Sequence, residues 1–463
     1  MKKIAFHNLG CKVNSYELES IIENFQKHGY EIVDFSQKAD IYIVNTCTVT
    51  NIADRKSRQM LHKAKALSPE SIVVALGCYV QTDTEGAAKD EAIDLLIGNN
   101  EKGRTLEYVE KLLKLREDRV GEDIGTGNIS AFYDTKTFEG RTIGDLTQKS
   151  EYENMSINKT EEHTRAFVKI QDGCDQFCSY CAIPLARGRV RSRSKEDTIS
   201  EIKSLRDNGY REIVVTGIHL SSYGLTDAYN IFARGDAYNE ALLELIAEIA
   251  QIDGIDRIRL GSLEPRLITR EFMERLSKID KVCPHFHLSL QSGSDTVLKR
   301  MNRQYSSGEF LDKAAIIREY YEHPAITTDI IAGFPAESEE EFLETVSFAN
   351  KVNLYETHVF KYSRRKGTVA DKMPGQHTDK VKSHRSSILM EDAAKRKDDF
   401  VRYYLGKTVE LLTEDIELIG GNSYRVGYTP EYVKCAVSGD NPENVLVTGK
   451  GKSILEGGVL LLE

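Results

Sequence analysis

Lys169-Ile-Gln-Asp-Gly-Cys174-Asp-Gln-Phe-Cys178-Ser-Tyr-Cys181-Ala-Ile-Pro184 is the most informative segment of this chain. Its three cysteines have the spacing C-x3-C-x2-C and follow a strand-like run at residues 166–170. This spacing is too tight for three unrelated core cysteines, and it suits a loop that wraps one metal centre. An iron–sulfur cluster usually takes four protein thiolates. Three thiolates would leave one iron with an open coordination site, and an open site is where a metal centre does chemistry.

The alternative for this segment is a structural zinc site of the Cys3His type. The nearest histidine is His163, which precedes Cys174 in a polar stretch. That spacing is not typical of a zinc site, so the sequence favours the cluster.

Length and composition bound the class of protein. The chain has 463 residues, which predicts about three domains, and 40% hydrophobic residues are enough for several cores. Its start resembles no signal peptide and no apolar run approaches the roughly 20 residues of a membrane span, so we expect a cytoplasmic protein without membrane contact. In that compartment its eight cysteines are reduced thiols or metal ligands. The net charge of −10 argues against a generic nucleic-acid or DNA binder, so an RNA substrate would need local basic patches.

Residues 1–115 are predicted to form an α/β domain with a parallel sheet. Short apolar runs alternate with helical patterns, which is typical of this class. A helix from Asn14 to about Gly29 has Asn14 and Glu17 in the spacing of a capping box. The other expected elements are a helix at 54–67 and strands at 3–7, 41–44, 71–76 and 94–97.

A second cysteine triad lies in this domain. Cys11, Cys47 and Cys78 each follow a predicted strand. Because the carboxyl ends of parallel strands face one crevice, the three thiols should converge, and nearby helix N-termini should favour their thiolates. The alternative is three buried structural cysteines. Three equivalent positions favour a second metal cluster, again with an open iron.

Residues 116–160 read as a linker, and residues 161–375 as an open (β/α)6 barrel. Six strand-like runs recur with helical patterns between them, and such barrels place active sites at the loops after the strands. Gly217, Ser262, Glu264 and Gln291 follow these strands and are candidate contacts of a cofactor; for Glu264 a structural ion pair is an open alternative. The six runs are 166–170, 212–216, 257–260, 285–290, 326–331 and 357–361, and the clearest helices are 194–208, 240–251, 310–321 and 339–350.

Four arginines and His219 in this region each have a functional and a structural interpretation. Arg187, Arg189, Arg191 and Arg193 alternate, so on an extended segment they would share one face. They suit recognition of a phosphate or a carboxylate ligand, or ion pairing with the protein's own acids. His219 is a structural or a catalytic histidine. Two further cysteines, at 283 and 435, lack partners at ligand spacing and should be core residues.

The C-terminal region should contain a helix at 376–405 and a small β barrel at 406–463. Five short alternating runs predict the barrel: 408–412, 424–427, 432–437, 444–447 and 454–462. Some small barrels bind oligonucleotides, but acidic residues outnumber basic ones here. A structural or protein-binding role is therefore an equal alternative.

The whole chain resembles the radical S-adenosylmethionine (SAM) methylthiotransferases. The two cysteine triads and the C-terminal barrel, similar to a TRAM domain, carry this resemblance. Three segments resemble the MtaB-like subgroup, which acts on N6-threonylcarbamoyladenosine in tRNA. They are Gly10-Cys11-Lys-Val-Asn14, Asn45-Thr-Cys47-Thr-Val-Thr50 and Thr216-Gly-Ile-His-Leu-Ser-Ser-Tyr-Gly224. The segment 362–367 has basic residues where the family has prolines, which should add positive charge at the barrel rim.

The resemblance implies a mechanism with two [4Fe–4S] clusters. Cys174, Cys178 and Cys181 would hold the cluster that cleaves SAM to give a 5′-deoxyadenosyl radical. Cys11, Cys47 and Cys78 would hold an auxiliary cluster that supplies or carries sulfur, and a second SAM would give the methyl group. The product would be 2-methylthio-N6-threonylcarbamoyladenosine at position 37 of tRNA, next to the anticodon. The cofactor carries this chemistry, and an electron donor such as flavodoxin would be a partner.

Two alternatives remain at this point. A sibling enzyme could act on N6-isopentenyladenosine of tRNA or on an aspartate of a ribosomal protein, since both triads are shared among siblings. A non-catalytic iron–sulfur carrier would belong to a different class, but a carrier needs no barrel with a rim of polar loops. No general acid or base can be assigned from the sequence.

Overall fold

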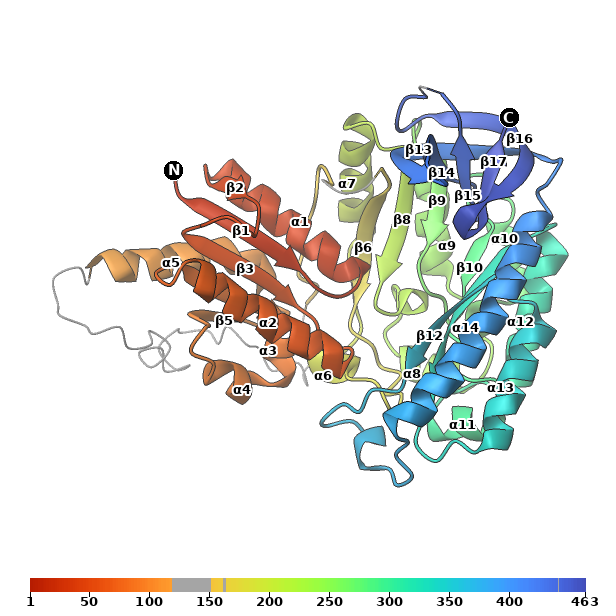
Figure 1. The fold of residues 1–463 in the computed structure, drawn as a ribbon, viewed down its shortest axis with the longest axis horizontal. Helices are drawn as coiled ribbons and strands as arrows, with labels where there is room; N and C mark the ends of the chain where they lie inside the picture. The colour runs from red at the N-terminus through yellow and green to blue at the C-terminus, as the bar shows by residue number, and fades with distance from the viewer. Residues whose placement is uncertain (119–150, 161–163, 440) are drawn as a thin grey trace. The chain divides into compact units, whose positions relative to one another are not determined.

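The computed structural model describes residues 1–118, 151–160, 164–439 and 441–463. The chain divides into two compact units (Figure 1). Unit 1 comprises residues 1–159, 172–193 and 363–371, and unit 2 comprises residues 160–171, 194–362 and 372–463. The cysteine loop at 172–193 therefore belongs to the same unit as the N-terminal residues, although it follows a barrel strand in sequence.

Unit 1 is built on a parallel five-stranded sheet with the order β2-β1-β3-β4-β5. The four predicted strands are confirmed, and the short edge strand β2 was not predicted. Every residue of β3 and β4 is buried, as expected for central parallel strands covered on both faces. The strands are β1 (Lys3–Asn8), β2 (Glu31–Val33), β3 (Ile41–Thr46), β4 (Ile72–Gly77) and β5 (Leu95–Ile97).

Helices cover both faces of this sheet. Leu61 and Ala64 of α2 pack with Tyr42 and Val44 of β3 in one core cluster. On the other face, Phe25 of α1 makes an edge contact with Phe6 of β1, with ring centroids 5.8 Å apart. The helices of unit 1 are α1 (Lys12–Lys27), α2 (Asn51–Leu67), α3 (Cys78–Thr82), α4 (Thr84–Ala88), α5 (Thr105–Asp118) and α6 (Ile183–Arg187), with a 3₁₀ turn η1 (Lys102–Arg104).

The predicted capping box at the start of α1 is wrong. The helix begins one turn earlier, with Cys11 as its N-cap residue, and Asn14 and Glu17 are buried inside it. The Asn14 side chain donates hydrogen bonds to the carbonyls of Leu9, at 2.7 Å, and Thr46, at 3.1 Å. Tertiary partners therefore engage Asn14, and Glu17 is likewise paired with residues distant in sequence.

The predicted linker is described only in part. The prediction for residues 119–150 lies outside the described residues, as does His163, the ligand of the zinc alternative. The helix α5 continues to Asp118, and residues 151–160 contain no helix or strand. The backbone N–H groups of Asn158 and Lys159 donate to the Glu23 carboxylate at 2.6 and 2.9 Å, so this part of the segment is fixed against α1.

Unit 2 contains the six predicted barrel strands, all parallel. β6, β8 and β9 form one sheet, β10, β11 and β12 form another, and isolated bridges between Ile258 and Val282 and between Leu263 and Leu288 connect the two. The strands are β6 (Ala166–Asp172), β8 (Glu212–Gly217), β9 (Arg257–Leu260), β10 (His285–His287), β11 (Ala325–Ala332) and β12 (Glu356–Lys361), whereas the short β7 (Arg191–Ser192) lies in the cysteine loop.

Helices follow the barrel strands as predicted. Ser306 and Ser338 form complete capping boxes with Glu309 and Glu341 at the starts of α12 and α13. The helices of unit 2 are α7 (Lys195–Asp207), α8 (Ala228–Ala233), α9 (Glu240–Ala250), α10 (Arg270–Leu276), α11 (Asp295–Arg300), α12 (Ser307–Tyr320), α13 (Glu339–Val352) and α14 (Asp379–Arg402). The last of these packs along β12 and β11 (Figure 1).

The C-terminal residues form the predicted five-stranded barrel, which is closed in the order β13-β14-β15-β17-β16. Some predicted bounds were wrong: β13 extends to Ile419 and β16 to Leu455. Residues 454–462 are not one strand, because a turn at Glu456–Gly458 separates β16 from β17. The strands are β13 (Thr408–Ile419), β14 (Asn422–Tyr428), β15 (Lys434–Val437), β16 (Leu446–Leu455) and β17 (Val459–Leu462).

The loop between β14 and β15 fixes this small barrel to the larger one within unit 2. Tyr432 stacks on Tyr428 at 4.5 Å and on His285 of β10 at 5.0 Å. The guanidinium groups of Arg165 and Arg259 lie over the Tyr432 ring, at 5.1 and 4.7 Å from its centroid. These stacking and cation–π contacts fix the loop against the larger barrel. Among the described residues, no helix is long and apolar enough to cross a bilayer.

Candidate functional site: two cysteine triads in one unit

The first triad lies at the carboxyl edge of the unit 1 sheet, as its placement after three strands predicted. Cys11 follows β1, Cys47 follows β3, and Cys78 begins α3 directly after β4. The Cys47 thiol is close enough to Cys78 and Cys11 for their charges to act on it. Gly10 allows this approach: it has a φ of +119°, and a Cβ there would lie 3.2 Å from the Cys47 Cβ.

The Cys47 thiol of this triad favours its protonated form, whereas the sequence analysis expected a thiolate. Burial raises the pKa of the Cys47 thiol to about 11, and Cys78 and Cys11 add to the rise. The expected promotion of a thiolate by nearby helix N-termini is therefore wrong for Cys47, because desolvation outweighs it. A bound metal would replace the proton, since the ligand is the thiolate.

The donor set of both triads fits an iron–sulfur cluster. All six sulfurs are free thiols. The Asn99 side chain donates to the Cys78 Sγ at 3.4 Å, and the Val49 backbone N–H donates to the Cys47 Sγ at 3.5 Å. N–H donors to sulfur are one of the means by which proteins tune such clusters. The sequence analysis missed Asn99, because no local spacing marks it.

The second triad lies in a tight loop of unit 1. Cys174, Cys178 and Cys181 are each partly exposed. The Cys174 N–H donates to the Gly188 carbonyl at 3.0 Å, which closes the loop, and the Ile183 N–H donates to the Cys181 Sγ at 3.5 Å.

Two positive φ angles shape this loop. Phe177 has a φ of 48° and Gly173 a φ of 70°. A Cβ at Gly173 would lie 1.9 Å from the Arg189 carbonyl oxygen, so only glycine fits there.

A buried charge network joins the loops of the two triads. Arg187 is fully buried and donates to Glu17 at 2.8 and 3.0 Å, to Asp172 at 3.1 and 3.2 Å, and to Asn14 at 2.6 Å. Lys102 also donates to Glu17, at 2.5 Å. Burial opposes the charge on Arg187, but the acids outweigh it and raise the pKa of Arg187. This network contacts α1 beside Cys11 and the strand end beside Cys174.

The contacts of the four arginines at 187, 189, 191 and 193 agree with ion pairing to the protein's own acids, the alternative to ligand recognition. Arg187 ends α6, and Gly188 follows with a φ of 71°, so the four arginines do not form one extended face. Arg191 pairs with Asp172 at 3.4 Å, and Arg193 donates to the Tyr16 hydroxyl at 3.1 Å. The side chain of Arg189 is the exposed one, at 46%, and it lies 3.5 Å from Asp175.

The expected gain of exposed charge in segment 362–367 is wrong for Arg365. This residue is buried in unit 1. It donates to Asp54 at 2.6 Å, to Thr48 at 2.5 Å and to Asn51 at 2.7 Å. It therefore stabilises the start of α2.

The four candidate SAM contacts lie in unit 2: Gly217 is the last residue of β8, Ser262 and Glu264 follow β9, and Gln291 follows β10. Ser262 is exposed, whereas Glu264 is buried. A Cβ at Gly217 would lie 2.9 Å from the Gln171 Oε1, which leaves no room for a side chain. Gln291 has a φ of 70° and its backbone N–H donates to the Asp329 backbone carbonyl at 2.9 Å.

Glu264 also makes the ion pairs that its structural alternative predicted. Its Oε2 lies 3.5 Å from the His219 Nε2 and 3.6 Å from Arg303. The His219 Nδ1 in turn lies 2.5 Å from the Ser222 Oγ, and this contact orients the ring with its Nε2 toward Glu264. The other two cysteines, Cys283 and Cys435, are core residues as predicted, and burial raises their pKa values to about 11 and about 12.

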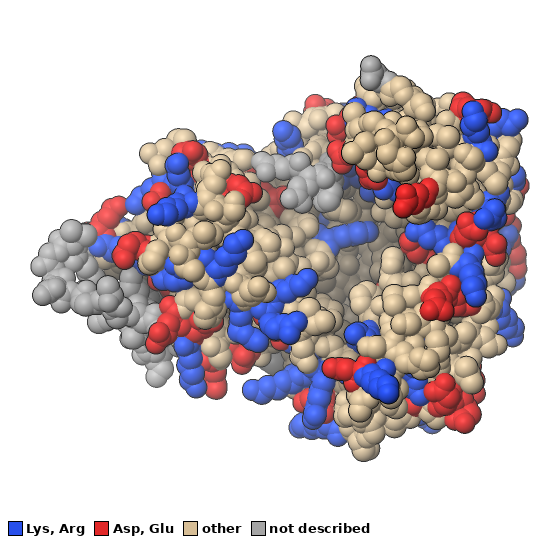
Figure 2. Space-filling view, in the orientation of Figure 1, with Lys and Arg blue, Asp and Glu red and all other residues tan. Residues whose placement is uncertain are grey.

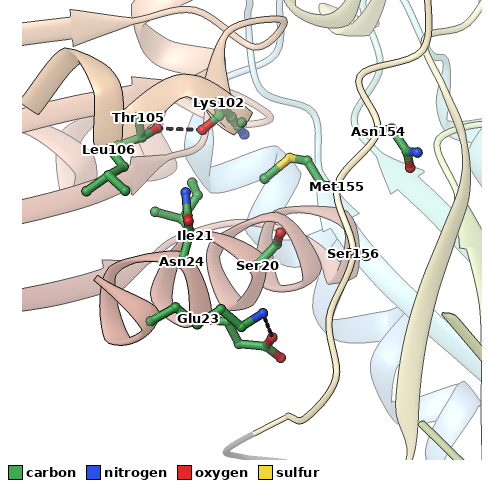
Figure 3. Close-up of a pocket in the computed structure, with 12 residues that line it drawn as sticks. Ser20, Ile21, Glu23, Asn24, Lys102, Thr105, Leu106, Asn154, Met155 and Ser156 are labelled. Carbon is green, nitrogen blue, oxygen red and sulfur yellow. Dashed lines mark hydrogen bonds and ion pairs between the residues drawn. The ribbon is translucent and has the colours of Figure 1, made fainter. Parts of the chain in front are cut away.

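A pocket of about 200 Å³ on unit 1 is separate from the cysteines and the candidate SAM contacts, although Lys102 of the buried network lines it. It lies between α1, the start of α5 and residues 154–156 (Figure 3). Its lining includes none of the cysteines. Within it Lys27 donates to Glu23 at 3.3 Å, and Glu23 also holds residues 158 and 159.

Known proteins match the chain over nearly its whole length. Residues 168–349 match the Radical SAM superfamily, and residues 3–98 match the Uncharacterized protein family UPF0004. Threonylcarbamoyladenosine tRNA methylthiotransferase MtaB of Bacillus subtilis is 36% identical, over 95% of this chain and 91% of that protein. The protein of the same name from Aquifex aeolicus is 36% identical, over 91% and 95%. This chain belongs to the radical SAM methylthiotransferase family.

Membership in this family makes the chain an enzyme that uses a [4Fe–4S] cluster and SAM. The tRNA-2-methylthio-N(6)-dimethylallyladenosine synthase of Finegoldia magna is also similar, at 32% identity over 88% of this chain and 82% of that protein. Among solved structures, the radical SAM methyltransferase TsrM of Kitasatospora setae matches with a TM-score of 0.53 and 13% identity, over 78% of this chain and 73% of that one. That likeness supports the fold alone.

Proposed function

We propose that this methylthiotransferase installs a methylthio group at C2 of N6-threonylcarbamoyladenosine next to the anticodon of tRNA. The observation that carries the substrate is the 36% identity, over most of both chains, to two proteins named for this reaction. The subgroup segments around Cys11, Cys47 and His219 point to the same substrate.

The proposal assigns a cluster to each triad. Cys174, Cys178 and Cys181 would hold the cluster that binds SAM, and Cys11, Cys47 and Cys78 the auxiliary cluster. Each has three protein ligands, so each leaves one iron open. When bound, the clusters and SAM supply the radical, the sulfur and the methyl group; a small electron carrier such as flavodoxin would deliver electrons.

In this proposal the side chains of the protein position the bound groups. Arg187 connects α1 to the strand end before Cys174 through Glu17 and Asp172, so it supports both cluster loops at once. Gly217 packs closely against Gln171 and has no side chain to block the approach of a cofactor to the backbone. We propose Gly217, Ser262, Glu264 and Gln291 as contacts of SAM, with Glu264 held in place by His219 and Arg303.

A basic surface on α2 supports an RNA substrate despite the net charge of −10. Arg55, Lys56, Arg58 and Lys63 are exposed on this helix, and Asp54 is its one acidic residue. Figure 2 shows blue side chains gathered over the position of α2. Such a cluster can neutralise backbone phosphates and supply a salt-dependent share of tRNA affinity.

A second substrate has a specific observation in its favour. Relatives named for dimethylallyladenosine in tRNA are 31–33% identical, close to the 32% of the MtaB protein of Thermotoga maritima. Mass spectrometry of nucleosides in tRNA, from host cells with and without this gene, separates the two. We expect loss of the methylthio form of threonylcarbamoyladenosine and accumulation of its parent. Loss of the methylthio isopentenyl form instead would contradict the assigned substrate.

A further inference from the structure

Three potential metal ligands lie on neighbouring barrel strands of unit 2. His287 is on β10, Asp329 on β11 and His358 on β12. Asp329 is paired directly with His358, whereas His287 is paired with Thr327, two residues before Asp329. Side chains two residues apart on a strand share a face, so all three project from the same side of this sheet.

This face is the one turned away from α14. Arg396 of α14 donates to the Thr357 Oγ1 at 3.1 Å, so Thr357 faces the helix and its neighbour His358 faces the opposite way. The three side chains remain accessible: His358 is exposed, and the Asp329 and His287 side chains are 33% and 13% exposed. A small ligand can therefore reach them.

The geometry is close to that of a coordination site. One ligand atom of each residue lies within 4.8 Å of the others. The His287 Nε2 is 3.6 Å from the Asp329 Oδ1, and the two imidazole rings are 5.8 Å apart with planes at 22°. Ligand atoms about 2.0–2.2 Å from a shared ion would be roughly 3–3.5 Å from each other. Small side-chain rotations would close the difference.

Neighbouring contacts orient one ligand and leave two others available. The His287 Nδ1 lies 3.0 Å from the Thr327 Oγ1, which directs its Nε2 toward Asp329. A metal-binding histidine is commonly fixed through its other ring nitrogen in this way. In the described part of the chain, neither the His358 ring nor the Asp329 carboxylate makes a hydrogen bond. Two ligand-type groups are thus available to a bound ion.

We propose that His287, Asp329 and His358 bind one divalent first-row transition-metal ion. Two imidazoles and one carboxylate suit ions such as Zn²⁺, Fe²⁺, Mn²⁺ or Co²⁺, whereas Mg²⁺ and Ca²⁺ prefer oxygen ligands. Three protein ligands leave coordination positions open, so the ion could take an oxygen ligand from a molecule bound against this face. The site uses none of the six cluster cysteines and does not depend on which nucleoside is the substrate.

Equilibrium dialysis of the cluster-loaded full-length protein against Co²⁺ tests this proposal. Loading both triads first keeps Co²⁺ from the cysteines, and cobalt differs from the cluster iron in elemental analysis. We expect one equivalent of bound Co²⁺ in the wild-type protein. His358→Ala and Asp329→Asn should each weaken this binding at least about tenfold. His384→Ala, which removes an exposed histidine of α14, should leave it unchanged.

Folding controls keep the test decisive. Asp329→Asn preserves shape, and His358 is exposed, so both variants should keep the iron content and thermal melting of the wild type. Equal Co²⁺ binding by the wild type and both variants would overturn the proposal. Absence of a stoichiometric Co²⁺ site in the wild type would overturn it as well. Neither result would affect the proposed methylthiolation, which the nucleoside assay measures separately.

Discussion

Replacing Arg187 by methionine should destabilise unit 1 by about 3 kcal/mol. Methionine keeps the apolar bulk but provides no donor, so Glu17 and Asp172 lose the cation that lies between them. Breaking a buried ion pair by removing one partner costs roughly 3–5 kcal/mol, because the other charge is left uncompensated. Here Glu17 keeps Lys102 at 2.5 Å and Asp172 keeps Arg191 at 3.4 Å, so the lower end applies.

Thermal and urea unfolding of the full-length protein measure this effect. For a unit of this size, about 3 kcal/mol corresponds to a melting temperature lower by roughly 6–12 °C. The matched control is Arg189→Met, two residues away: its side chain is 46% exposed and its acid is 3.5 Å distant. That change should cost about 1 kcal/mol or less. Arg187→Lys should fall between the two, because lysine keeps the charge but cannot contact both acids in a fork.

The comparison between the two methionine variants decides whether the buried network stabilises the unit. If Arg187→Met and Arg189→Met unfold within about 0.5 kcal/mol of each other, the ion pairs of Arg187 contribute nothing beyond those of an exposed arginine. The assignment of Arg187 as the support of both cluster loops would then be refuted.

Three further perturbations probe other parts of the account. In cluster-free protein at pH 8, iodoacetamide should modify exposed Cys11 far faster than buried Cys47, because raising the pKa of Cys47 from 9.0 to about 11 lowers its thiolate fraction about 100-fold. The rate of Cys47 modification should keep rising up to about pH 11, and equal rates for the two cysteines at pH 8 would refute this prediction. Changing Arg55 and Lys56 to glutamine should reduce the slope of log K for tRNA against log salt by about 1.5, and an unchanged slope would exclude α2 from the interface. Tyr432→Ala should cost about 2 kcal/mol in unit 2, measured by urea unfolding, since stacking and two cation–π contacts are lost.

Much of the fold could be predicted because most of its strands are recognisable from the local sequence pattern. Buried strands such as β3 and β4 begin with apolar runs of four or more residues, and the cysteines that follow them could be assigned to one edge of a parallel sheet. The turn at Glu456–Gly458 also had a local signal, the glycine pair, whose φ angles are 76° and 75°. Joining the flanking runs into one strand overlooked this signal.

The remaining features depend on tertiary contacts that no local pattern encodes. Asn14 and Glu17 matched a capping box, yet Glu17 is paired with Lys102 and Arg187 from distant parts of the chain. The same holds for His287 and His358, which lie far apart in sequence and are brought together by strand register. Long-range pairing of this kind requires the structure.

A reaction with purified components tests the central claim most directly. The enzyme, with both clusters reconstituted under anaerobic conditions, would be given SAM, a reductant and an equal mixture of tRNAs carrying threonylcarbamoyladenosine or isopentenyladenosine. Mass spectrometry of the digested nucleosides should show the methylthio group on threonylcarbamoyladenosine and its absence when Cys47 or Cys178 is changed to alanine. A methylthio group on isopentenyladenosine alone, or none on either nucleoside, would contradict the account.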